Sequence, residues 1–200
     1  MLYLSEMKRL LAILILIFTL QTPSQADDIR DLEVEGMSIG DSALDFFSEK
    51  KIKKAGKNGF IYPNKKYYSA TFYNEPIFET YDEIQFHLKN KDKKYMINSI
   101  SGHIIYEGNI DKCYAEMKKI TSEIKSLFKS STIDNAGTNK HPADKSGKSS
   151  VKSIYIDLDS GEYVSVECFD WSKEKKFTDT LTIAIDTKEF ASWLTNEASK

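Results

Sequence analysis

The chain has 200 residues, with 28 lysine and arginine residues against 30 aspartate and glutamate residues and a formal net charge of −2. This near balance offers no basic excess of the kind that attracts nucleic acid, so we expect no nucleic-acid partner. Arginine occurs only at Arg9 and Arg30, which disfavours sites that bind phosphate or carboxylate through arginine's planar fork.

The N-terminal 26 residues have the pattern of an export signal. Residues 10–20 form an apolar run preceded by Lys8 and Arg9, and Ser24 and Ala26 stand at the two positions that a signal peptidase reads. The alternative, a membrane anchor, needs roughly 20 apolar residues. We therefore expect residues 1–26 to be removed, the protein to be periplasmic or secreted, and the mature chain to have no transmembrane segment.

Residues 27–200 are long enough for one sizeable core and are expected to form a single α+β domain. The first predicted element is a short helix that Ser38 or Asp41 caps. Its buried face would consist of Ile39, Ala43, Leu44 and Phe47. Residues 50–59 follow as a basic turn region.

Three strands and a helix are predicted next. Residues 67–73 are rich in aromatic residues, residues 81–88 alternate between apolar and polar, and residues 94–106 form a third strand that bends or bulges near Gly102. Residues 109–130 form the clearest helix. Its apolar stripe repeats at intervals of four and three residues, through Cys113, Met117, Ile120, Ile124 and Leu127.

Residues 131–150 are polar and rich in Gly, Ser, Asn and Lys, so we expect a flexible linker between halves 27–130 and 151–200. The second half repeats the order of the first, with a hairpin over residues 152–158 and 163–171, a strand over 180–185 and a helix over 186–197. Asp186 would cap that helix, with Glu189 completing a capping box. The order β-β-β-α, occurring twice, predicts antiparallel sheet with the helices on one face.

The linker contains Gly147-Lys148-Ser149, which resembles the end of a phosphate-binding loop. Such a loop needs a glycine five positions before that Gly147, where this chain has Pro142, and it opens a helix rather than a strand. We therefore expect no nucleotide at this segment.

The two cysteines, Cys113 and Cys168, are expected to form a disulfide. Cys113 lies on the apolar stripe of the long helix, and Cys168 lies with Val164 and Val166 on one face of its strand, so both point to a core. The alternative is a redox pair, but that usually shows two cysteines separated by two residues.

Catalytic and metal-binding patterns are weak. His87, His103 and His141 are scattered, and no carboxylate cluster completes a set of metal ligands, so neither a metal nor a cofactor is expected. A hydrolase that uses Asp157, Asp159 or Glu162 is a minority hypothesis. It depends on carboxylates beside a turn, which are also common on solvated strands.

A more informative feature is an aromatic strand face. If the helices cover the side that carries Cys168, then Tyr155, Tyr163, Phe169 and Trp171 lie on the opposite side. An exposed patch of this kind suits a sugar or a protein partner. The alternative is that these rings pack against the first half of the chain.

Four segments together resemble a family of small exported bacterial proteins with no known activity. They are GMSIGDSALDFFS (residues 36–48), NIDKCYAEMKKI (109–120), HPADKSGKS (141–149) and VECFDWS (166–172). The resemblance spans the mature chain and includes both cysteines, but it assigns no functional residue. A weaker resemblance, limited to Gly36-Met37 and the element order, is to small envelope modules of the β-lactamase-inhibitor or outer-membrane-assembly type, and it concerns the fold alone.

These observations favour an exported, non-catalytic binding or interaction protein of the bacterial cell envelope, with an unknown protein or small molecule as its partner. A periplasmic receptor for a small, sugar-like ligand, bound in a pocket between sheets, is the first alternative, and a small hydrolase is the second.

The predicted processing can be tested by intact mass spectrometry of protein purified from the oxidising compartment. We expect a mature chain that starts at Asp27 and is lighter than the reduced chain by the two thiol hydrogens of Cys113 and Cys168. A mass that includes residues 1–26 would contradict cleavage, and a fully reduced mass would contradict the disulfide.

Overall fold

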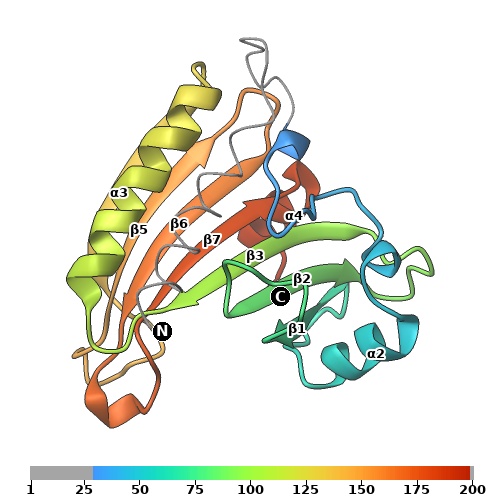
Figure 1. The fold of residues 1–200 in the computed structure, drawn as a ribbon, viewed down its shortest axis with the longest axis horizontal. Coiled ribbons are helices and arrows are strands. Elements are labelled where there is room, and N and C mark those ends of the chain that lie inside the picture. The colour runs from blue at the N-terminus through green and yellow to red at the C-terminus, as the bar shows by residue number, and fades with distance from the viewer. Residues whose placement is uncertain (1–28, 199–200) are drawn as a thin grey trace.

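The computed structural model describes residues 29–198, so the predicted signal peptide lies outside the described residues. The described chain forms one seven-stranded antiparallel sheet in the order β1-β2-β3-β7-β6-β5-β4 (Figure 1). The strands are β1 (Tyr67–Tyr73), β2 (Glu83–Lys89), β3 (Ile97–Ile105), β4 (Thr132–Lys140), β5 (Ser150–Asp157), β6 (Tyr163–Asp170) and β7 (Thr180–Asp186). The α-helices are α2 (Glu49–Lys57), α3 (Ile110–Leu127) and α4 (Lys188–Asn196), and the 3₁₀ helices are η1 (Ile29–Asp31), η2 (Ala43–Asp45) and η3 (Lys173–Lys175).

The predicted α+β class is confirmed, and the alternation of side chains gives the sheet two different faces. One face carries the core side chains, such as Val166 of β6 and Ile183 of β7, and α3 packs on it across β5, β6 and β7 (Figure 1). We call this the α3 face. The opposite face, which we call the α4 face, carries small and polar residues that are paired across the central strands, such as Ser101, Ala184 and Ser165.

The sequence predicted that the helices lie on one face of the sheet, but the structure places them on both faces. Phe47 and α2 pack against the α3 face of β1 and β2, where the rings of Phe47 and Phe72 stack 4.1 Å apart. In contrast, Phe190 of α4 contacts Tyr67 and His87, which point to the opposite face. Accordingly, α4 lies behind the sheet in Figure 1, while α3 lies in front of it. The capping pattern predicted the last helix but could not tell which face of the sheet it would cover.

Residues 131–150 are not a flexible linker, because Thr132–Lys140 form β4, which pairs with β5 over its whole length. Most β4 side chains are exposed, so the strand is held by backbone hydrogen bonds and leaves no apolar alternation in the sequence. Its register shifts between Asn135 and Gly137, and Gly137 has a φ of +68°, which glycine adopts without strain. The second half therefore contributes four strands.

The predictions for the N-terminal region are also corrected. Ser42, rather than Ser38 or Asp41, caps the short η2, and Leu44 is 41% exposed rather than buried. The predicted basic turn is the helix α2, which Ser48 caps. Its lysines surround a narrow buried side that consists of Ile52 and Gly56, so its apolar signal is weak.

The predicted cap of the last helix lies one residue away from the observed one. Thr187 is the N-cap of α4, and its Oγ1 accepts a hydrogen bond of 3.2 Å from the backbone N–H of Phe190. Asp186 ends β7 instead and is buried on the α4 face.

The predicted disulfide is confirmed. Cys113 of α3 and Cys168 of β6 are both fully buried, their Cα atoms are 6.0 Å apart, and the bond fixes α3 to the sheet. Within residues 29–198, no helix combines the length and the apolar character needed to cross a membrane.

Reduction should lower the free energy of unfolding by about 4 kcal/mol, because the bond closes a loop between residues 55 positions apart. Denaturant titrations with and without reductant measure this difference. The double variant Cys113→Ala/Cys168→Ala is the control and should be insensitive to reductant. Equal midpoints for the oxidised and reduced wild type would contradict a stabilising bond.

Candidate binding surface

The four aromatic residues predicted to form one binding face lie on the α4 face as two separate pairs. The rings of Tyr155 and Tyr163 stack 5.6 Å apart, and those of Phe169 and Trp171 stack 6.3 Å apart. Tyr163 and Phe169 stand at opposite ends of β6, and six strand residues span roughly 20 Å. The structure therefore forms two aromatic groups and not one continuous patch.

The pair that contains Trp171 is part of a larger group. The Trp171 ring lies 4.2 Å from that of His141 and 4.8 Å from that of Phe177, and His141 also contacts Phe169 at 5.6 Å. His141 follows β4 and Phe169 lies near the end of β6. Trp171 and Phe177 lie in the connection from β6 to β7. We call these four residues the aromatic cluster. Phe177 is 62% exposed, the highest value among the large hydrophobic residues described.

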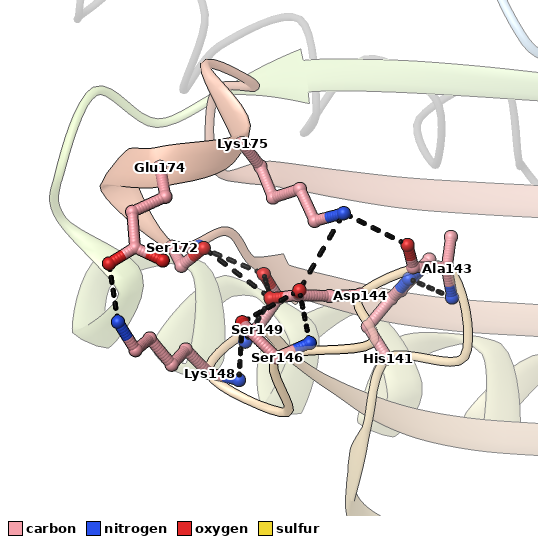
Figure 2. Close-up of polar contacts among 9 residues, drawn as sticks. All are labelled: His141, Ala143, Asp144, Ser146, Lys148, Ser149, Ser172, Glu174 and Lys175. Atoms are coloured by element: carbon pink, nitrogen blue, oxygen red, sulfur yellow. Dashed lines mark hydrogen bonds and ion pairs between the residues drawn. The ribbon is translucent and has the colours of Figure 1, made fainter.

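Next to the cluster, the carboxylate of Asp144 organises the turn between β4 and β5 (Figure 2). Asp144 Oδ1 accepts hydrogen bonds from the backbone N–H and the hydroxyl of Ser146, at 3.0 and 2.7 Å. Its Oδ2 accepts from the backbone N–H and the hydroxyl of Ser149, again at 3.0 and 2.7 Å. Led by the two serine hydroxyls, these donors hold the pKa of Asp144 well below its usual range, so the carboxylate is charged at neutral pH.

The same network connects the turn to the segment that follows β6. The backbone N–H of Ser172 donates to Ser149 Oγ at 3.0 Å, and Lys175 Nζ donates to the carbonyl of Ala143 at 3.1 Å (Figure 2). Lys175 Nζ also lies 3.6 Å from Asp144 Oδ1. These contacts fix the turn that carries His141 against the segment that carries Trp171.

This turn contains the sequence that resembles a phosphate-binding loop. Its backbone N–H groups do surround an anion, but that anion is the carboxylate of Asp144. Gly147 has a φ of +69° and completes the turn, and the strand β5 follows instead of a helix. The donors that a phosphate would need are already used by the chain's own side chain.

The Tyr155–Tyr163 pair is connected to the polar centre of the α4 face. Glu167 accepts a hydrogen bond of 2.7 Å from the Ser153 hydroxyl and one of 3.4 Å from the Tyr155 hydroxyl. Burial raises the pKa of Tyr163, and the nearby Tyr155 and Glu167 raise it further. The Tyr163 hydroxyl therefore stays protonated at neutral pH.

Serine, histidine and aspartate also meet on the α4 face, at Ser99, His87 and Asp186. His87 Nδ1 lies 3.2 Å from Ser99 Oγ, and its Nε2 lies 3.1 Å from the hydroxyl of Tyr62. Burial lowers the pKa of His87 to about 4 and raises that of Asp186 to about 6, although a hydrogen bond from Ser99 opposes the second shift. In a serine hydrolase the histidine lies between serine and aspartate. Here the serine lies between the other two and is 2% exposed, so it does not form that relay.

The three carboxylates considered for hydrolysis lie around the turn between β5 and β6. Glu162 is half-buried there, and its Oε2 has no hydrogen-bond partner among the described residues. Asp157 and Asp159 are exposed at the turn between β5 and β6. His103, the remaining histidine of the sheet, lies between Ser101 at 3.1 Å and Thr182 at 2.9 Å, and burial lowers its pKa to about 4. Residues 29–198 contain no group of three or more His, Cys, Asp or Glu side chains that could hold a metal ion.

A cavity of about 80 Å³ lies on the α3 face between α3 and the sheet. Its lining is mainly aliphatic, from Ile120 and Ile124 of α3 and Ile183 of β7, with Glu33 and Glu123 among the few polar residues. It cannot be the pocket between two sheets that a sugar receptor was expected to have, because all seven described strands belong to one sheet. Its lining suits a small apolar group better than a sugar.

Comparisons of the chain with protein families, with curated proteins and with solved structures find no match. The resemblance to a family of exported bacterial proteins therefore stays a prediction, and the candidate surface is argued from its own geometry.

Among the residues of this surface, sequence reasoning found Phe169 and Trp171 from strand alternation. It missed Phe177, which follows three lysines within residues 173–176. It also did not connect His141 with the aromatic residues, because the segment that contains His141 looked like a linker. A weak signal was present, since Phe177 is the only apolar residue in the polar segment 172–180.

The variant Asp144→Asn should melt at a lower temperature than the wild type at neutral pH, because it removes the charged acceptor that orders the turn. The folded pKa of Asp144 lies below the unfolded value of about 3.9. The stabilisation is therefore complete above about pH 4 and is lost as the pH falls further, so the two melting curves should converge in acid.

The matched control is Asp134→Asn, which removes an exposed carboxylate from β4 and should leave the melting temperature nearly unchanged. If Asp144→Asn melts at the wild-type temperature at neutral pH, the turn does not depend on this carboxylate.

Proposed function

We propose that the protein is an exported, non-catalytic binding protein of the bacterial cell envelope, and that the aromatic cluster is its contact surface. The observation that carries this proposal is the exposure of Phe177, whose ring contacts that of Trp171. Exposed aromatic rings are costly on a monomeric protein and are typical of contact surfaces.

The rigidity of the surroundings supports the same function. The Asp144 network fixes one side of the cluster, and the backbone N–H of Trp171 donates a hydrogen bond of 2.8 Å to the buried Asp179. A surface that is already ordered before binding loses little conformational entropy when a partner binds. Such a frame is therefore suited to recognition.

The other polar groups of the sheet support binding more than catalysis. His87 and His103 are neutral at physiological pH because of their burial, and their ring nitrogens are already within hydrogen-bonding distance of side-chain hydroxyls. A general acid or base needs a pKa near the working pH and a free path to a substrate. Export is supported by the Cys113–Cys168 bond, since disulfides persist in oxidising compartments.

Purified mature protein should sediment with isolated bacterial cell-envelope fragments, and Phe177→Ser should weaken this binding on the order of tenfold. The expected loss follows from the apolar area that the Phe177 ring no longer buries against a partner. Co-sedimentation over a range of fragment concentrations gives the apparent affinity.

Tyr73→Ser is the matched control, because Tyr73 is 61% exposed and lies in β1, away from the cluster. It should bind as the wild type does. Equal binding by the wild type and Phe177→Ser would reject the aromatic cluster as the contact surface, and circular dichroism would show whether each variant is folded.

A further inference from the structure

The aromatic cluster is bordered by lysines. Segments 140–148 and 173–176 contain six lysines against only Asp144 and Glu174, a local net charge of +4 in a chain whose net charge is −2. Glu174 forms an ion pair with Lys148, and Asp144 is enclosed by its serine donors. The two acidic groups are thus already engaged. Exposed lysines remain at Lys140, Lys145, Lys173 and Lys176.

The apolar ring and the ammonium groups lie on the same projection. Phe177 follows η3, and Lys176 has a φ of +55°, so the chain reverses just before the exposed ring. In Figure 1 this connection between β6 and β7, drawn in orange-red, extends beyond the end of the sheet. The projection therefore presents one exposed apolar side chain that closely follows the exposed Lys173 and Lys176.

We propose that this surface, defined by Phe177, Trp171 and the lysines around them, binds an anionic lipid bilayer. The inference rests on the proposed function and names the partner of the same surface. Phe177 enters the boundary between headgroups and acyl chains, while the lysine ammonium groups contact lipid phosphates. The Trp171 ring, which contacts that of Phe177, lies at the headgroup level, where tryptophan is favoured.

Charge complementarity favours a bilayer over a protein partner. Lysine is depleted at protein–protein interfaces, which prefer arginine and buried aromatic residues. Segments 140–148 and 173–176 contain no arginine, so they lack the planar fork that reads a single phosphate in a fixed geometry. Exposed lysines near an exposed ring instead suit a diffuse layer of negative charge.

Two further acids lie close to this surface and do not oppose the inference. Asp179 is buried and accepts the hydrogen bond from the Trp171 backbone. Asp170 is half-buried, and burial followed by the charge of Asp179 raises its pKa. Both acids belong to the base of the projection and not to its tip.

The test measures co-sedimentation of the mature protein with two kinds of vesicle. One consists of phosphatidylcholine alone, and the other contains equal amounts of phosphatidylcholine and phosphatidylglycerol. We expect binding to the anionic vesicles only, with an affinity that falls as salt is added. Equal binding to both kinds of vesicle, or binding to neither, would overturn the proposal.

Two variants test which residues are responsible. The triple variant Lys145→Gln/Lys173→Gln/Lys176→Gln should bind the anionic vesicles on the order of a hundredfold more weakly. Its control, Lys57→Gln/Lys93→Gln/Lys118→Gln, removes the same charge from exposed positions in α2, α3 and a distant turn and should lose much less. Equal losses would show that net charge alone acts, and would overturn the assignment to this surface.

Fluorescence places the surface in the bilayer. The chain has two tryptophans, and Trp193 is 1% exposed in the packing of α4. Brominated phosphatidylglycerol should therefore quench the Trp171 fraction of the emission in the wild type. It should quench much less in the Lys145→Gln/Lys173→Gln/Lys176→Gln variant. Absence of quenching in vesicle-bound wild type would place Trp171 outside the bilayer and overturn the proposed orientation.

The envelope and vesicle experiments separate the two proposals. Binding to envelope fragments that depends on Phe177, without binding to anionic vesicles, would retain the contact surface and identify its partner as a protein or polysaccharide. Failure of the folded protein to bind either would reject both proposals.

Discussion

The pairing of β3 with β7 is the constraint on which the architecture depends. It runs from Ser99 opposite Asp186 to Ile105 opposite Thr180 and joins strands that are about 80 residues apart in sequence. Without it, each half would have an open strand edge and too little core to cover its sheet. With this pairing, the α3 face becomes one apolar surface. The Cys113–Cys168 bond then joins α3 to β6, the strand on the other side of β7. Because such a long-range pairing costs loop entropy before it contributes stability, the local elements next to it must be strongly specified.

The parts of the fold that were predictable from sequence are those that bury an apolar pattern. The apolar stripe of α3 and the alternation in β2 and β6 consist largely of buried side chains. The same alternation correctly placed Cys168 and Phe169 on opposite faces of the sheet. In contrast, β4 contributes almost no buried side chain and has no hydrophobic period to detect. The helix α2 does separate its lysines from its buried side, but its apolar residues are so few that the lysine-rich segment resembles a turn. The face that α4 covers depends on tertiary packing of Phe190 and Trp193 and has no local signature.

The candidate surface illustrates the same limit. Phe169 of β6 and Trp171 just after it were accessible to reasoning about alternation. Phe177 and His141 join them only because two connections converge at one end of the sheet. The loop that resembles a nucleotide-binding motif contains a glycine and serines because they order the turn around a charged group. Backbone N–H groups and hydroxyls gather around a negative charge, and here that charge belongs to Asp144. A motif of this kind therefore reports the presence of an anion without identifying its source.

The polar outer strand β4 has a consequence for how the molecules behave at high concentration. The sheet ends at β1 on one side and at β4 on the other, and each end exposes backbone groups that could pair with a strand from another molecule. Hydrophilic side chains along β4, together with the kink between Asn135 and Gly137, make that end a poor template for such growth. The segment that carries the weakest folding signal in the chain thus limits the formation of fibrils and other open-ended aggregates.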